Sequence, residues 1–293
     1  PGMSLDGIGF AMQRDQCWMP LADAFTGYVT RCQKLLQAGH PVTDIAVFSG
    51  EEVPRRSVLP DKLVASLPGP MGGARLESEA ERLSDKGLEK VVLPYGVNWT
   101  SGTYLGEDWV NPLGGYAYDS VNPDVFLRAE AKDGKMVLPS GAEYSLVIFP
   151  LPHKMNPRAR KFSSDVLDNI TVLRARGVNV LVPELLPYTE ADFSALGIEP
   201  DLTIESVDGR TGDLRGEVAW CHRKDGDRDI YFLAPQNGKG GRYTLSFRVS
   251  DETPEIYDPV SDGDKPVVEV KVSGGRTFIT LDFVPNESCF VLF

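Results

Sequence analysis

The hydrophobic pattern of this chain changes its period near residue 205, and this change constrains the fold more than any other feature. Before that point, helically spaced apolar residues alternate with short continuous apolar runs, which is the pattern of helices between buried strands. After it, apolar and polar residues alternate between closely spaced turns, as in half-buried strands. The 293 residues therefore predict an α/β part followed by an all-β part.

The first part begins with an amphipathic helix predicted over residues 21–36. Its apolar residues recur with helical spacing: Leu21, Ala24, Phe25, Tyr28, Val29, Cys32, Leu35 and Leu36. Gly39 is expected to end the helix in a left-handed conformation, because Pro41 cannot continue it. A buried strand at 44–48 follows and leads into a polar loop at 50–54.

Helices and apolar strands continue to alternate up to residue 182. Strands are predicted at 136–138, 144–149 and 178–182, and helices near 123–132 and 156–176. Continuously apolar strands between helices are typical of a parallel sheet that is covered on both faces. We therefore predict a flavodoxin-like α/β domain over residues 41–204.

Within this domain, the segment of about 60–113 is predicted to be an irregular insertion. It is rich in Gly and Pro and then in aromatic residues, including Trp99, Tyr104 and Trp109. Long irregular loops in compact domains usually have a function, such as covering a cleft.

The last part is predicted to be an antiparallel β-sandwich over residues 205–293. Strands are expected at 217–223, 229–234, 243–249, 255–257, 267–272, 277–283 and 288–293. The turns between them are polar and rich in glycine, which favours antiparallel neighbours.

The charge balance excludes several classes of partner. Thirty Lys and Arg residues against 42 Asp and Glu residues give a formal charge of −12, which repels nucleic acid and anionic membranes. No apolar run reaches the about 20 residues that cross a bilayer, and the first residues lack the layout of a secretion signal. We expect a soluble chain with neither nucleic acid nor membrane as partner, and the composition leaves the oligomeric state and the compartment open.

No metal site is predicted in this chain. Its four cysteines form no CxxC pair, and only three histidines could help them bind zinc. Scattered cysteines in a chain of this length are usually buried as small apolar residues, and a disulfide is the alternative.

The motifs of the common enzyme classes do not occur in the sequence. No GxGxxG follows a strand, and neither a Walker loop nor HExxH is found. Ser101 and Ser140 lack the GxSxG elbow, and His153 and His222 have no evident catalytic partner.

Glu51 and Glu52 are the strongest candidates for chemistry, since they follow a predicted parallel strand at the end where open α/β sheets bind ligands. In one interpretation, one of them is a solvated charge and the other stabilises a nearby helix N-terminus. In the other, Glu51 is a general acid or base, with Glu52 as the alternate, because glycoside hydrolysis needs two carboxylates in different environments. Asp119 is a candidate second acid, or else the N-cap of the helix that follows it.

Several motifs, each weak alone, follow one another in a recognisable order. They are Gln13-Arg14-Asp15-Gln16-Cys17-Trp18, Gly50-Glu51-Glu52-Val53-Pro54, Gly115-Tyr116-Ala117-Tyr118-Asp119, Leu138-Pro139-Ser140-Gly141, His222-Arg223, Asp229-Ile230-Tyr231-Phe232, Phe247-Arg248 and Asp258-Pro259. This order resembles the α-L-rhamnosidases of glycoside hydrolase family 106 over nearly the whole chain, apart from about 60–113 and a shortened region near 184–214.

The resemblance implies an inverting hydrolase that removes terminal α-L-rhamnose from plant cell-wall or similar glycans, with calcium at its site. It also implies that family members are much longer, with a (β/α)8 barrel whose last strand and helix correspond to residues 1–40. We therefore expect the carboxyl-terminal portion of such an enzyme, inactive or nearly so in isolation. No cofactor is expected in this chain, whereas calcium and a periplasmic or extracellular location are expected for the longer protein.

Substrate contacts are expected from six residues, of which one departs from the family pattern. They are Asp15, Gln16, Trp18, Trp99, Trp109 and Asp119. The family favours Asn where Asp15 stands, which weakens the transfer of a role to that segment. The alternative function is a non-catalytic glycan-binding or structural module, in which Trp99, Tyr104 and Trp109 stack on sugar rings.

Overall fold

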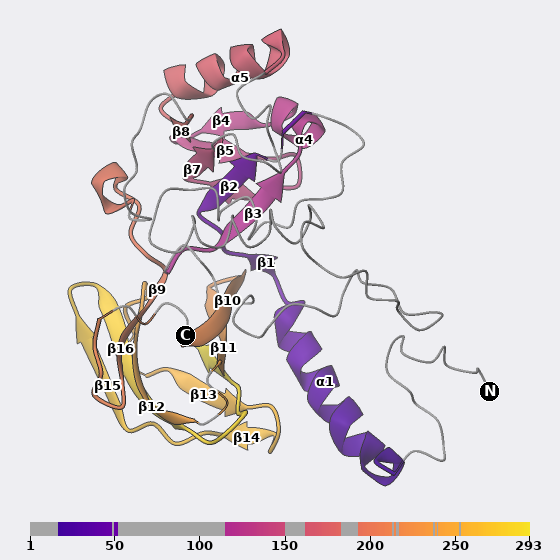
Figure 1. The fold of residues 1–293 in the computed structure, drawn as a ribbon, viewed down its shortest axis with the longest axis vertical. Helices are drawn as coiled ribbons and strands as arrows, with labels where there is room; N and C mark the ends of the chain where they lie inside the picture. The colour runs from indigo at the N-terminus through magenta and orange to yellow at the C-terminus, as the bar shows by residue number, and fades with distance from the viewer. Residues whose placement is uncertain are drawn as a thin grey trace, which may run out of the picture.

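The computed structural model of the chain describes residues 17–48, 50–51, 115–149, 162–182 and 193–293, the last range without 213, 215, 216, 237, 239 and 252. The predicted insertion at about 60–113 lies outside these residues. The described part is rich in β-structure, with few helices (Figure 1). A parallel sheet with helices lies at one end of the molecule, and antiparallel sheets lie at the other.

The parallel sheet has four strands in the order β3-β2-β7-β8. These are β3 (Tyr118–Val121), β2 (Ile45–Phe48), β7 (Leu146–Ile148) and β8 (Asn179–Leu181), and each neighbouring pair is parallel. All four residues of β2 are buried, because Ala46 and Phe48 enter one core while Ile45 and Val47 enter another. Cores on both faces explain the continuous apolar run of this strand.

Two helices contribute to the core that contains Phe48. They are α4 (Pro123–Leu127) and α5 (Ser164–Ala175), which bury Phe126 and Ile170 there. The opposite face packs against Tyr116, Phe193 and Ile198, around the short 3-10 helix η3 (Ser194–Leu196).

The helix predicted near 123–132 is wrong in its second half. Residues Glu130–Lys132 form β4, which pairs with β5 (Lys135–Val137), and β6 (Glu143–Tyr144) completes a small antiparallel sheet. Asp133 and Gly134 both have positive φ, at 50° and 74°. A two-residue turn with positive φ at both positions favours a hairpin, so this turn pairs the residues on either side of it.

Two larger antiparallel sheets lie in the other part of the described chain. One has the order β1-β10-β11-β17-β13-β14 and the other β15-β16-β12-β9. Their strands are β1 (His40–Pro41), β9 (Leu202–Val207), β10 (Val218–Asp225), β11 (Arg228–Pro235), β12 (Gly241–Phe247), β13 (Glu255–Asp258), β14 (Gly263–Asp264), β15 (Glu269–Ser273), β16 (Arg276–Phe283) and β17 (Cys289–Leu292).

One core joins both antiparallel sheets. It contains alternate residues of their strands, such as Tyr231 and Leu233 of β11 and Leu245 and Phe247 of β12. Only every second residue of a strand faces this core, which explains the period of two in the sequence. Strand β9 was not predicted, and it begins ahead of the change of pattern at residue 205.

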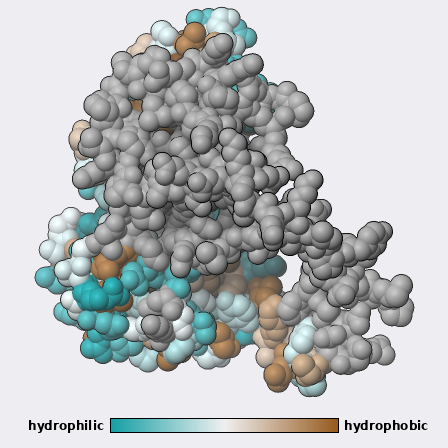
Figure 2. Space-filling view, viewed as in Figure 1, coloured by the Kyte–Doolittle hydropathy of each residue, from teal (hydrophilic) through white to brown (hydrophobic). Residues whose placement is uncertain are grey.

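Helix α1 (Ala22–Leu36) confirms the helix predicted near the start of the chain. Its second half packs on the six-stranded sheet, where Cys32 shares a core with Ile230 and Phe290. Its first half points away from the sheets, and Phe25 in this half and Leu21 just ahead of the helix are 42% and 69% exposed. Figure 2 shows this apolar surface at the end of α1.

The cysteines carry free thiols, so the disulfide alternative is wrong. Burial as small apolar residues applies to Cys32 and Cys289, whereas Cys17 and Cys221 are exposed. No helix among the described residues is long and apolar enough to cross a membrane.

Gly39 has a φ of +53°, as the sequence predicts, and it lies close to a neighbouring strand. A Cβ at this position would lie 1.9 Å from the carbonyl oxygen of Lys224 in β10.

We expect Gly39→Ala to lower the free energy of unfolding by about 2–3 kcal/mol, since the strained φ and the clash add. Urea denaturation measures the loss. Gly141→Ala is the control, because its φ is +88° but nothing lies within 4 Å, so only about 1 kcal/mol is expected. Equal losses would contradict the role of the close approach.

Candidate functional site

Glu51 lies just beyond the carboxyl end of β2, as predicted. Its carboxylate accepts hydrogen bonds from Ser163, at 2.6 Å from the backbone N and 2.5 Å from Oγ. Ser163 is the N-cap of α5, and its Oγ also accepts from the backbone N of Val166 at 3.4 Å. Glu51 therefore lies at the N-terminus of α5, where the partial positive charge of the helix favours an anion. This arrangement agrees with the interpretation that one glutamate of the loop stabilises a helix N-terminus.

Asp119 lies inside β3, where it pairs with Ala46 of β2. Its Oδ2 accepts a hydrogen bond from the hydroxyl of Tyr144 at 3.0 Å. Burial, together with the charge and hydrogen bond of Asp119, raises the pKa of Tyr144, so this phenol stays a donor. Because Asp119 pairs with a residue within β2 and Glu51 follows the end of that strand, the two carboxylates lie at different levels of the sheet.

The N-cap interpretation of Asp119 is wrong. The cap of α4 is Asn122, whose Oδ1 accepts from the backbone N of Val125 at 2.9 Å. Pro123 follows directly as the first helical residue, where its fixed φ suits a helix start. The residue ahead of that proline is therefore the one placed to cap.

Trp18 is the only one of the other expected contact residues within the described part of the chain. It precedes the 3-10 helix η1 (Met19–Leu21), and its ring lies edge-on to that of Phe25, with centroids 6.4 Å apart. The remaining candidates lie outside the described residues: Asp15, Gln16, Glu52, Trp99 and Trp109.

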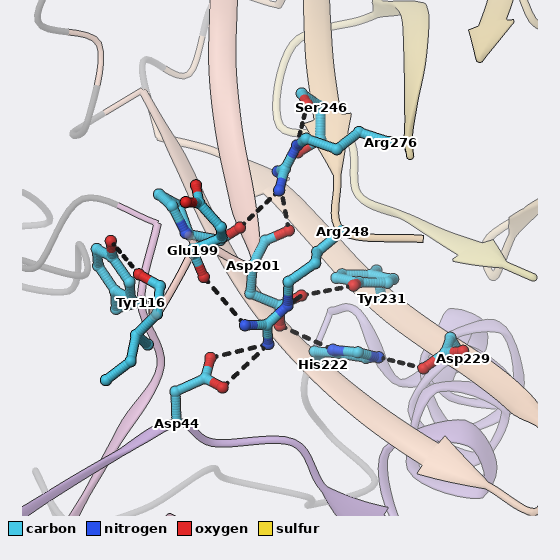
Figure 3. Close-up of polar contacts among 12 residues, drawn as sticks. Asp44, Tyr116, Glu199, Asp201, His222, Asp229, Tyr231, Ser246, Arg248 and Arg276 are labelled. Atoms are coloured by element: carbon cyan, nitrogen blue, oxygen red, sulfur yellow. Dashed lines mark hydrogen bonds and ion pairs between the residues drawn. The ribbon is translucent and has the colours of Figure 1, made fainter. Parts of the chain in front are cut away.

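A buried group of charged side chains, which the sequence did not predict, lies between the parallel sheet and the antiparallel sheets (Figure 3). We call it the Asp201 cluster, and it comprises Asp44, Asp201, His222, Asp229, Tyr231 and Arg248. Asp201 is 1% exposed. Its Oδ1 accepts from the hydroxyl of Tyr231 at 2.7 Å, and its Oδ2 lies 2.8 Å from Nδ1 of His222.

His222 has two carboxylate partners, which the sequence did not indicate. Its Nε2 lies 2.9 Å from Oδ1 of Asp229, whose Oδ2 accepts from Lys224 at 2.8 Å. The ring stacks on Tyr231, with centroids 3.9 Å apart and an angle of 14° between the planes. The turn after Lys224 sets the register of the hairpin β10–β11 and so places His222 opposite Tyr231. This contact could have been predicted from the sequence, but no local pattern indicates the contact with Asp201.

Arg248 connects the two parts of the molecule. Its Nη2 donates to both carboxylate oxygens of Asp44, at 3.1 and 2.9 Å, and its Nε lies 3.8 Å from Oδ1 of Asp201. Asp44 precedes β2, and its backbone oxygen accepts from the amides of Ser145 and Leu146 ahead of and within β7. Burial raises the pKa of Asp44, although the charge of Arg248 opposes this rise.

Arg276 holds the backbone on the other side of Asp201. It donates to Oγ of Ser246 at 2.7 Å, to the carbonyl oxygen of Pro200 at 2.8 Å and to that of Asp201 at 3.3 Å. Burial is the main cause that lowers the pKa of this guanidinium.

The Asp201 cluster connects the parallel sheet to the antiparallel sheets. Each of its charged side chains contacts an opposite charge, and Asp201 and His222 are buried. The described residues also contain no group of three His, Cys, Asp or Glu side chains that could hold a metal ion.

Comparison with known proteins identifies related sequences and folds. Residues 1–71 match the family model of glycoside hydrolase family 106, described as α-L-rhamnosidase. A protein of Formosa agariphila, provisionally named a β-glucuronidase, is 25% identical over 313 residues, which cover 100% of this chain and 23% of that protein. The solved structure of a rhamnosidase from Novosphingobium sp. PP1Y has a TM-score of 0.60 at 23% identity, covering 99% of this chain and 26% of that one.

The chain thus spans about a quarter of the length of these two proteins. The family match covers α1, β2 and Glu51, and the structural likeness extends to the antiparallel sheets. The predicted resemblance to the α-L-rhamnosidases of glycoside hydrolase family 106 is therefore confirmed: the chain is similar to them in sequence over residues 1–71 and shares a β-rich fold with a rhamnosidase over nearly its whole length.

Proposed function

We propose that this chain is the carboxyl-terminal part of an inverting glycoside hydrolase of the α-L-rhamnosidase type, which acts on rhamnose-containing glycans. The observation that carries the proposal is the family match over residues 1–71, because this segment contains both α1 and Glu51. Rhamnose as the sugar rests on this match. The likeness to a protein provisionally named a β-glucuronidase supports a glycoside substrate without choosing the sugar.

Within this proposal, the chain supplies one carboxylate and a longer protein supplies the other. An inverting hydrolase needs an acid and a base about 6.5–9.5 Å apart. Glu51 lies at the ligand-binding edge of the parallel sheet, whereas Asp119 lies inside β3. The second carboxylate and the calcium ligands would then come from outside the described residues, and the chain alone would be inactive.

The exposed end of α1 supports a larger assembly. Leu21 and Phe25 are apolar and exposed, although they continue the same stripe that packs Cys32 on the six-stranded sheet. We propose that this apolar surface contacts further protein. We assign residues 1–40 to the end of a (β/α)8 barrel. The rest of this barrel would cover the exposed apolar surface of Leu21 and Phe25.

We also propose that the two parts of the chain have the two predicted folds. A parallel sheet with the order β3-β2-β7-β8 and helices α4 and α5 supports a flavodoxin-like domain. Two antiparallel sheets that share one core support a β-sandwich.

The test is rhamnose release from an aryl α-L-rhamnoside. We expect the longer protein to hydrolyse this substrate, the isolated chain to be inactive, and Glu51→Gln in the longer protein to lose at least about 100-fold in kcat/KM, the usual contribution of a general acid or base. Glu143→Gln is the matched control, because Glu143 is exposed and pairs with Lys135. It should keep full activity.

Two outcomes would count against the proposal. Brisk hydrolysis by the isolated chain would show that both catalytic carboxylates lie within this chain. Unchanged turnover of a folded Glu51→Gln variant would mean that Glu51 has no catalytic role. Its only role would then be the contact with Ser163 at the start of α5.

A non-catalytic accessory module is the second candidate function. The observation that favours it is that both carboxylate oxygens of Glu51 already accept hydrogen bonds from Ser163. Calorimetry of this chain with rhamnose-rich oligosaccharides should then show binding that Trp109→Ala abolishes. No heat of binding would count against this function.

A further inference from the structure

Both ring nitrogens of His222 face carboxylate oxygens. Nδ1 lies 2.8 Å from Oδ2 of Asp201, and Nε2 lies 2.9 Å from Oδ1 of Asp229. An ionised carboxylate only accepts hydrogen bonds, and a neutral imidazole has a single N–H. A neutral ring would therefore turn a lone pair toward one of the two carboxylates. Only the imidazolium form satisfies both contacts, and its stacking on Tyr231 favours the same charged form.

Charged and titratable groups from several elements surround this ring. They are Asp201 ahead of β9, Asp229 and Tyr231 on β11, Lys224 on β10 through Asp229, Arg248 after β12, Asp44 ahead of β2, and Arg276 on β16 through the backbone of Asp201. Strand β1 leads into a backbone contact, from the amide of Val42 to the carbonyl oxygen of His222.

A continuous path of contacts leads from His222 across to the parallel sheet. Asp201 contacts both His222 and Arg248, and Arg248 in turn holds Asp44 ahead of β2 (Figure 3). If His222 loses its proton, Asp201 loses a charged partner. The carboxylate of Asp201 then competes more strongly with Asp44 for the guanidinium group. Coupling across a shared network of this kind is the usual result when its members contact one another.

We propose that His222 is a pH-sensitive lock between the parallel sheet and the antiparallel sheets, closed while the ring is an imidazolium and weakened when it loses a proton. The lock is independent of the proposed hydrolase function, because its residues lie apart from Glu51 and it acts on the fold of this chain. It uses proton exchange with solvent and no other reactant.

The direction of the pH dependence follows from the contacts. Burial lowers the pKa of His222, but the hydrogen bonds and charges of Asp201 and Asp229 outweigh it, so the pKa is raised. A raised pKa in the folded state means that the stabilisation is complete below the unfolded value of about 6.5. It is lost as the pH rises from there through the folded value.

The first experiment compares thermal unfolding of the wild-type chain and His222→Gln between pH 6 and pH 9. Glutamine resembles the neutral ring in offering both a donor and an acceptor. We expect its Tm to be lower by about 6 °C or more at pH 6, as for removal of one partner of a buried ion pair. The gap should narrow steadily toward pH 9. His40→Gln is the matched control, because His40 is exposed, and its gap should stay small at every pH.

The second experiment tests whether the effect crosses between the sheets. Asp44→Asn removes the charge on the side of the parallel sheet. We expect the Tm losses of Asp44→Asn and His222→Gln to be non-additive by about 1 °C or more at pH 6 and to approach additivity at pH 9, since contacting networks couple and independent sites do not. Additive losses at both pH values would overturn the lock, because His222 would then stabilise the antiparallel sheets alone.

A third measurement needs no variant that could fail to fold. Ring 15N NMR of the wild-type chain should show both nitrogens of His222 protonated at pH 6, with a midpoint of titration above 6.5. A midpoint below 6.5, or a single protonated nitrogen at pH 6, would overturn the proposal. A constant gap in Tm between the wild-type chain and His222→Gln from pH 6 to pH 9 would do the same.

Discussion

Asp201→Ala should lower the free energy of unfolding by about 3–5 kcal/mol, as expected when one partner of a buried charge network is removed. Asp201 is 1% exposed, and it accepts hydrogen bonds from Tyr231 and His222. The variant leaves the imidazolium of His222 with Asp229 as its carboxylate partner, and the guanidinium of Arg248 with Asp44 and the carbonyl oxygen of Glu199. Two cations would then lie beside a cavity that no carboxylate occupies. Urea denaturation at pH 6 measures the loss.

The control for this prediction is an aspartate in an exposed ion pair. Asp124 contacts Arg128 one helical turn away, and their side chains are 76% and 58% exposed. Asp124→Ala should therefore change the stability by about 0.5 kcal/mol or less. If the two alanine variants lost similar amounts, the Asp201 cluster would contribute no more than a surface pair.

Phe48→Ala should also lower the free energy of unfolding by about 3–5 kcal/mol, the usual range for a fully buried phenylalanine. The Phe48 side chain is 1% exposed and contacts a group of aromatic rings. Its centroid lies 4.6 Å from that of Phe149, 5.4 Å from that of Phe126 and 6.1 Å from that of Phe162. Removing the ring creates a cavity in the centre of this group, beside the strand that leads to Glu51.

Phe25→Ala is the matched control, because it makes the same substitution at a residue that is 42% exposed on the free end of α1. It should cost about 1 kcal/mol or less in the isolated chain. Chemical denaturation of both variants compares them directly. A loss at Phe25 as large as that at Phe48 would mean that the end of α1 is covered within this chain.

The local elements could largely be predicted from the sequence, because their signals lie within a few residues. The apolar period of α1 and the buried run of β2 are examples, and so is the period of two in β16, whose alternate residues are buried. The failure at β4 has a local cause as well. The pattern ahead of Asp133 and Gly134 predicts a helix, whereas the turn at these two residues pairs that segment with β5.

The Asp201 cluster could not be predicted in the same way. Arg248 and Asp44 are 204 positions apart in the chain, and Asp201 and His222 are 21 apart. Charged residues are common in this sequence, with 42 Asp and Glu residues, so composition cannot select the pairs that meet. Which charged residues meet depends on how the parallel sheet lies against the antiparallel sheets. No local periodicity specifies this arrangement. The position of Glu51 after β2 follows from the local pattern, whereas its partner Ser163 is 112 positions away.

The packing of α1 has a consequence for how the chain folds during synthesis. This helix is synthesised long before the residues that cover its apolar stripe, which are Ile230, Phe290 and Leu292. The edge strand β1 likewise pairs with β10, which is synthesised much later. Long-range pairing of this kind slows folding and leaves apolar surface uncovered in the meantime. A nascent chain stalled ahead of β17 would therefore expose α1 to chaperones, which release it once β17 is made.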